Sequence, residues 1–233
     1  MNRPALLASL QSKLGSANFN DWTFNRWQFY DYSIYPGAGV TELPFFANPL
    51  GSQDPNATAG SSKTLEDTNV NTGRKFGQVY YFITEIRTHL NFAPKNRQPS
   101  AIASDADLLL STWGNCMEEV ANLFQSGVLQ ISIGQKGYFD IVKPLLQAPP
   151  GFGVEIDQPA TITTFNQIVT QGYRRMDTYV VDPIQMIEPD QTFNASIVYP
   201  DGIPVTFTNT VNSATPLLKI GLIFDGFIAR PVQ

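Results

Sequence analysis

Short stretches in which apolar and polar residues alternate recur along this chain, and they constrain its fold more than any other feature of the sequence. The clearest are residues 76–92 and 128–134, where β-forming side chains occupy every second position. The alternation slips once near Thr84–Glu85, which predicts a bulge in the strand. The same pattern, with turn residues between the segments, predicts further strands at 40–47, 138–146, 178–187, 192–199, 205–208 and 217–229.

One long stretch departs from this alternation. Between residues 104 and 125 apolar side chains recur at helical spacing, and Gly127 follows as a helix stop. The apolar stripe consists of Leu109, Trp113, Met117, Val120 and Phe124. Shorter helices are expected at 3–14 and near 164–171. About eight strands with one interior helix are typical of an all-β, two-sheet sandwich of the jelly-roll type, which we expect to form a single domain over residues 36–233.

Residues 19–35 are rich in aromatic side chains, with polar residues between the rings. Aromatic residues are enriched both in protein cores and at interfaces, so these rings either fill the domain core, dock on a neighbouring subunit or meet a membrane surface. We expect residues 1–35 to form an N-terminal helix followed by an extended aromatic arm. The interface candidates are Trp22, Trp27, Phe29 and Tyr30, together with Arg230 in the C-terminal tail. Deleting residues 1–35 is then expected to leave the sandwich folded but to prevent assembly.

The charge content bears on the partners of the chain. Charged residues make up 15% of it, against about 25% in typical domains. Much of the surface must therefore carry uncharged polar groups, which a neighbour can cover without stranding ions. The net charge is −5 and the basic residues are scattered, so no direct nucleic-acid binding is expected. The single cysteine, Cys116, cannot form an intrachain disulfide, and no stretch approaches the ~18 apolar residues of a membrane span.

The sequence is poor in groups for catalysis. His89 is the only histidine, and no cysteine lies near it in the sequence, whereas a zinc site needs about four such ligands. No spacing singles out a pair of carboxylates, and no glycine-rich segment continues as a phosphate-binding loop. We therefore expect a protein that is not an enzyme, with no catalytic residue, no metal site and no cofactor.

The C-terminal half resembles a known group of proteins. A strand at 179–187 leads into a corner with Pro189, Gln191 and Phe193, and a second strand follows. The terminal strand at 217–229 ends in an Arg-Pro-Val-Gln tail. Over about residues 76–233 this arrangement resembles the jelly-roll capsid proteins of tailless, often membrane-containing icosahedral bacteriophages.

The resemblance implies a virion protein, made in the host cytoplasm, that forms trimers or pentamers with copies of itself in an icosahedral shell. It also implies contact with other capsid proteins or with an internal lipid membrane. Major capsid proteins of that group often carry two jelly rolls in one chain, whereas this chain has strands for one. The resemblance therefore leaves a major, a minor and a vertex role open.

Two alternatives from other classes stay open as well. A receptor- or glycan-binding β-sandwich on a virion surface would show a shallow, exposed pocket lined by Trp or Tyr. A small hydrolase would show a cleft with two facing carboxylates whose pKa values are shifted.

Overall fold

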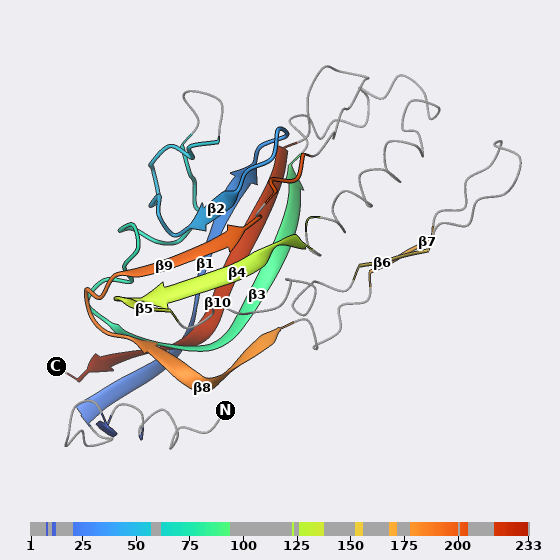
Figure 1. Ribbon diagram of the computed structural model, residues 1–233. Helices are drawn as coiled ribbons and strands as arrows, with labels where there is room; N and C mark the ends of the chain where they lie inside the picture. Colours follow the sequence, from blue (N-terminus) through green and yellow to red (C-terminus); the bar gives the residue numbers. More distant parts are fainter. Residues whose placement is uncertain are drawn as a thin grey trace, which may run out of the picture.

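Two antiparallel four-stranded sheets make up most of the computed structural model of the chain (Figure 1). It describes residues 21–56, 62–93, 126–137, 178–199, 201–204 and 217–232, the short segments 152–155 and 168–171, and Ala8, Gln11, Ser12 and Leu123. The first sheet has the order β1-β10-β3-β8 and the second β2-β9-β4-β5, while β6 and β7 form a separate ribbon. The expected all-β fold is thus confirmed.

The bounds of the strands agree with most of the predicted segments. They are β1 (Trp22–Tyr35), β2 (Glu42–Phe45), β3 (Tyr80–Ala93), β4 (Val128–Ile133), β5 (Lys136–Gly137), β6 (Phe152–Glu155), β7 (Ile168–Gln171), β8 (Tyr179–Ile187), β9 (Phe193–Val198) and β10 (Leu217–Pro231). The predicted strands at 40–47, 128–134, 178–187 and 192–199 each contain one of them, and those at 76–92 and 217–229 match β3 and β10, which end one and two residues later. Alternation of apolar and polar residues therefore located these strands correctly.

The two sheets share one hydrophobic core, because alternate residues of each strand turn the same way. Figure 1 shows the second sheet lying across one face of the first. At the centre, Phe76 stacks on Phe29 of β1 with ring centroids 3.9 Å apart and an interplanar angle of 8°. Phe193 of β9 and Phe224 of β10 meet the Phe76 ring from the two sheets, at 4.4 and 6.4 Å. Rings of this size bury large apolar areas, so this cluster holds the two layers together.

Strand pairing in the two sheets is nested. β1 pairs with β10, β2 with β9, β3 with β8 and β4 with β5, so the first strands meet the last ones in reverse order. Apart from the β4–β5 hairpin, each connection within this series leads from one sheet to the other. The chain therefore crosses back and forth between the sheets as one long folded hairpin, with β6 and β7 outside the series.

Strand β3 carries the irregularity that the sequence predicts. Its register with β8 shifts between Ile83 and Glu85, where the alternation slips, so the predicted bulge is confirmed. The neighbouring strand β10 shifts between Asp225 and Gly226. A Cβ atom at Gly226 would overlap the carbonyl oxygen of Phe82, so the two backbones approach too closely for any residue except glycine.

Strand β1 corrects the expected role of the N-terminal segment. The second half of the predicted arm, Trp22–Tyr35, is a strand that pairs with β10 over its whole length. Deleting residues 1–35 would remove this paired strand, so we now expect the deletion to unfold the sandwich rather than to leave it folded. The helix expected near 164–171 is also wrong at residues 168–171, which form β7.

Several predicted elements lie largely outside the described residues. They are the helix at 104–125, the strands at 138–146 and 205–208, and most of the helix at 3–14. Leu123, near the end of the first of these, is buried and accepts a backbone hydrogen bond from Gly127 at 3.1 Å. This bond is of the kind expected at the end of a helix, while the rest of that helix stays a prediction.

Candidate functional site

The five interface candidates occupy different environments. Trp27 is 47% exposed and Arg230 is exposed near the end of β10, so both are accessible in the single chain. Trp22 and Tyr30 are partly buried. Phe29 is buried in the core, so its ring is not available to a neighbour while the chain is folded. A role of the other four residues in an interface stays a prediction.

The first sheet extends beyond the second, which explains why Trp27 is exposed. β1, β3 and β10 have 14, 14 and 15 residues, whereas β2, β4 and β9 have 4, 6 and 6. Figure 1 shows the start of β1 and the end of β10 projecting past the second sheet. Trp27 lies on this projecting half of β1, just before the core residue Phe29.

A second apolar cluster covers the projecting part, on the face turned away from the main core. Its centre is formed by Phe82 and Ala229, which are fully buried. Around them lie the partly buried side chains of Trp22, Phe24, Tyr80, Ile184, Met186 and Phe227. The outward face of the projecting half is therefore apolar, whereas the opposite face of β1 there carries the exposed residues Thr23, Asn25 and Trp27.

The free edge of β1 is covered from Gln28 to Ile34 by a loop, here called the strap, which comprises the described residues 46–56 and 62–76. The backbone N–H of Tyr32 donates to the carbonyl of Asp67 at 2.7 Å, and the N–H of Tyr30 donates to the Asn69 side chain at 3.1 Å. A further hydrogen bond joins the N–H of Ile34 to a strap carboxylate at 3.1 Å. These bonds occupy the groups with which another strand would pair.

A buried ion pair fixes the strap to β1. The Nζ of Lys63 lies 2.7 Å from the Oδ1 of Asp31, and the two side chains are 2% and 0% exposed. The N–H of Phe46 donates to the other oxygen of Asp31 at 2.7 Å. Burial raises the pKa of Asp31 from 3.8 to about 6, because the loss of solvation outweighs the attraction of Lys63. The group that faces Asp31 is a lysine, so this is not the carboxylate pair that the hydrolase alternative requires.

The other strand edges are short or interrupted by proline. β8 contains Pro183 and β2 contains Pro44, and a proline has no N–H to donate to a new strand. β5 has only two residues. Addition of a strand from another chain is therefore disfavoured at β2, at β8 and along the strap-covered half of β1.

Two ion pairs lie on the outward face of the first sheet. The Nη2 of Arg87 lies 2.6 Å from the Oδ2 of Asp225, and the amide of Gln28 donates to the same carboxylate. Lys219 and Asp67 form a second pair at 2.5 Å. Although burial opposes it, the hydrogen bond from Lys219 lowers the pKa of Asp67. These four charges cost less to cover with a partner than free ions would, because each already has a counter-charge.

His89 belongs to the same face. The Tyr32 ring crosses Gly221, where a Cβ atom would overlap it, and the Tyr32 hydroxyl lies 3.1 Å from the Nδ1 of His89. Burial, and then the charge of Arg87, lower the pKa of His89, so the imidazole is neutral at pH 7. This placement agrees with a structural role for His89 in the packing of the face.

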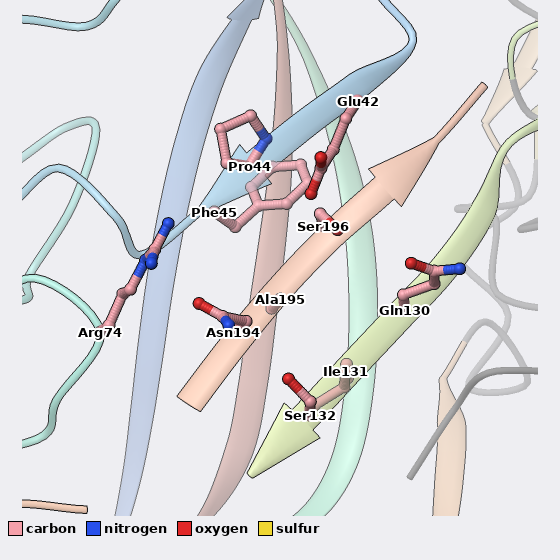
Figure 2. Close-up of a pocket in the computed structure, with 10 residues that line it drawn as sticks. All are labelled: Glu42, Pro44, Phe45, Arg74, Gln130, Ile131, Ser132, Asn194, Ala195 and Ser196. Carbon is pink, nitrogen blue, oxygen red and sulfur yellow. The ribbon is translucent and has the colours of Figure 1, made fainter. Parts of the chain in front are cut away.

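The outward face of the second sheet is hollowed. A depression of about 220 Å³ lies over β2, β9 and β4, and Figure 2 shows the side chains around it. The residues that line it from the outward side, here called the hollow residues, are Glu42, Pro44, Arg74, Gln130, Ser132, Asn194 and Ser196. The described lining contains no Trp or Tyr and only one carboxylate. It therefore differs from the Trp- or Tyr-lined pocket by which the glycan alternative was to be recognised, and it lacks the carboxylate pair expected of a hydrolase.

The hollow residues were not singled out by the sequence. Strands predict which residues face outward, so Gln130 and Ser132 are expected on one face of β4 and Asn194 and Ser196 on one face of β9. Their meeting depends on the pairing of Gln130 with Ser196 and of Ser132 with Asn194. That register joins segments separated by more than sixty residues, and no local signal encodes it.

No group of three or more His, Cys, Asp or Glu side chains within the described residues is placed to hold a metal ion. Likewise, the structurally described part of the chain contains no helix with the length and apolar character needed to cross a membrane. Comparison with protein families, with curated proteins and with solved structures gives no match for this chain. The strand order and the surfaces described above therefore carry the information on function.

Proposed function

We propose that this chain is a virion structural protein, a single jelly roll that assembles with copies of itself into an icosahedral capsid shell. The observation that carries the proposal is the nested pairing of eight strands, β1 with β10, β2 with β9, β3 with β8 and β4 with β5. Two four-stranded sheets connected in this way are what a jelly roll requires, and this fold is frequent in viral capsid proteins. One fold can serve several functions, so evidence for self-assembly must come from the surfaces of the chain.

The surface of the chain favours association through the faces of its sheets over association through strand edges. The strap covers the second half of β1, and prolines interrupt β2 and β8, so these parts of the edges are protected against uncontrolled strand addition. The outward face of the first sheet carries paired charges beside a partly exposed apolar cluster. Such a face can be buried against a sister molecule with little loss of ion solvation.

The proposal includes the partners that the resemblance implies. The chain would form trimers or pentamers within the shell and contact other capsid proteins or an internal lipid membrane. It would act in the virion without catalysis. Trp27 is the interface candidate with the best support, because its ring is large, about half exposed and placed on the projecting half of β1.

Sedimentation velocity of the purified full-length chain tests the proposal. We expect wild-type protein to form large closed oligomers, and Trp27→Ser to shift the distribution toward small species while the far-UV circular dichroism stays unchanged. Leu65→Ser is the matched control, because Leu65 is also a large exposed apolar residue but lies on the strap. Equal assembly of Trp27→Ser and wild type would remove Trp27 from the interface, and a monomeric wild type under all conditions would contradict the proposed function.

A further inference from the structure

The hollow on the second sheet brings together polar side chains from three paired strands in a defined register. On its floor Ser196 stands between Pro44 of β2 and Gln130 of β4, its cross-strand neighbours on the two sides. Asn194 stands opposite Ser132 in the next row. Small side chains thus form the floor, and longer ones form the walls seen in Figure 2.

The polar side chains of the hollow have no partners within the described chain. No hydrogen bond or ion pair joins the side chain of Glu42, Arg74, Gln130, Ser132, Asn194 or Ser196 to another described residue. Ser196 is only 7% exposed as a residue, and its side chain lines the hollow. Its hydroxyl opens into the hollow, so a ligand seated there can take the place of the water that otherwise hydrates it.

The two charges of the hollow have opposite signs and lie on different sides of it. Figure 2 shows the Glu42 carboxylate and the Arg74 guanidinium apart from each other around the rim. Arg74 is held in the left-handed conformation, with φ 59°, by backbone hydrogen bonds to Phe46 at 2.6 Å and from Phe193 at 3.1 Å. A non-glycine residue is uncommon in this backbone conformation, and such residues occur often at binding and active sites. One acid and one base at opposite sides favour a ligand without net charge.

From these observations we propose that the hollow binds one neutral sugar ring of a glycan. Sugar hydroxyls both donate and accept hydrogen bonds, and amides, hydroxyls, a carboxylate and a guanidinium together supply both kinds of partner. The volume of about 220 Å³ is below the roughly 300–1,000 Å³ of sites for drug-sized ligands, and fits a single ring. Pro44, which is partly buried in the hollow, offers an apolar surface to the carbon face of the ring in place of an aromatic side chain.

This inference goes beyond the proposed shell function and does not depend on assembly. Saturation-transfer difference NMR tests it on the full-length chain, since the method detects ligands of monomers and of large particles alike. The probes are D-glucose, D-galactose, D-mannose and N-acetyl-D-glucosamine, with glucosamine and glucuronate as charged counterparts. We expect saturable transfer to at least one neutral sugar at millimolar concentrations, and weaker transfer to the charged sugars.

Variants then locate the site. Asn194→Ala and Gln130→Ala are each expected to weaken sugar binding about two- to tenfold, as the loss of one or two hydrogen bonds predicts. Asn25→Ala is the matched control, because Asn25 is an exposed strand asparagine on the other sheet, and its affinity is expected to equal that of wild type. No transfer to any neutral sugar, preference for a charged one, or equal binding by Asn194→Ala and Asn25→Ala would each overturn the proposal.

Discussion

The ion pair between Lys63 and Asp31 offers a sharp test of how the strap is held. Replacing Lys63 with Met keeps the length of the side chain but leaves the Asp31 carboxylate buried without its cation, 2.7 Å from where the ammonium was. Replacing Asp31 with Asn keeps an acceptor for the Phe46 N–H and strands the ammonium instead. Removing one partner of a buried pair costs about 3–5 kcal/mol, a large share of the ~5–15 kcal/mol that stabilises a typical domain.

A double-mutant cycle measures the coupling between the two side chains. Urea unfolding followed by tryptophan fluorescence at pH 7 gives the free energy of unfolding of wild type, Asp31→Asn, Lys63→Met and the double variant. Because the double variant buries no charge, its loss of stability is expected to be smaller than the sum of the two single losses by about 2 kcal/mol or more. Two single losses that simply add would refute the account of the strap as anchored by this pair.

The pH dependence of the same variants has a defined sign. A carboxyl whose folded pKa is raised from 3.8 to about 6 binds its proton more tightly in the folded state, so its contribution to stability falls as pH rises through that window. The full shift of the Asp31 pKa corresponds to a change of about 3 kcal/mol in the free energy of unfolding. The stability of wild type relative to Asp31→Asn is therefore expected to fall between about pH 4 and pH 6. A constant difference across this range would show that Asp31 is not buried as described.

Three further predictions concern the core and the outward face. Gly226→Ala is expected to lower the melting temperature more than Gly221→Ala, because the first new methyl meets backbone and the second meets a ring that can move. Phe76→Ala, which empties the centre of the ring cluster, is expected to cost about 3–5 kcal/mol in urea unfolding, and a loss below 1 kcal/mol would contradict its central position. The NMR titration midpoint of His89 is expected below its usual 6.5, and a midpoint above this value would contradict its burial beside Arg87.

The sequence predicts strands well where alternation is undisturbed. Residues 76–92 and 128–134 gave β3 and β4, and the slip near Thr84 gave the bulge. The aromatic tract was harder, because strongly aromatic residues suit a core strand and an interface equally. Its assignment to β1 is decided by pairing with β10, whose residues lie about two hundred positions away and leave no local signal.

The candidate surfaces were less accessible to prediction than the strands. In the sequence, Asp31 and Lys63 resemble ordinary surface residues. The fold of the strap brings them together and buries them. The hollow residues are isolated polar positions whose convergence follows from the register of β2, β9 and β4. Exposure of individual residues likewise depends on tertiary placement, which is why Phe29 is in the core and Trp27, two residues earlier, is accessible.

Electron microscopy of the purified full-length chain tests the central claim most directly. Faces with paired charges, protected strand edges and eight nested strands lead us to expect closed particles of uniform diameter, whose class averages show icosahedral symmetry. Fields that contain only isolated molecules of about 25.8 kDa, at every protein concentration and ionic strength tried, would contradict a shell-forming role for this chain.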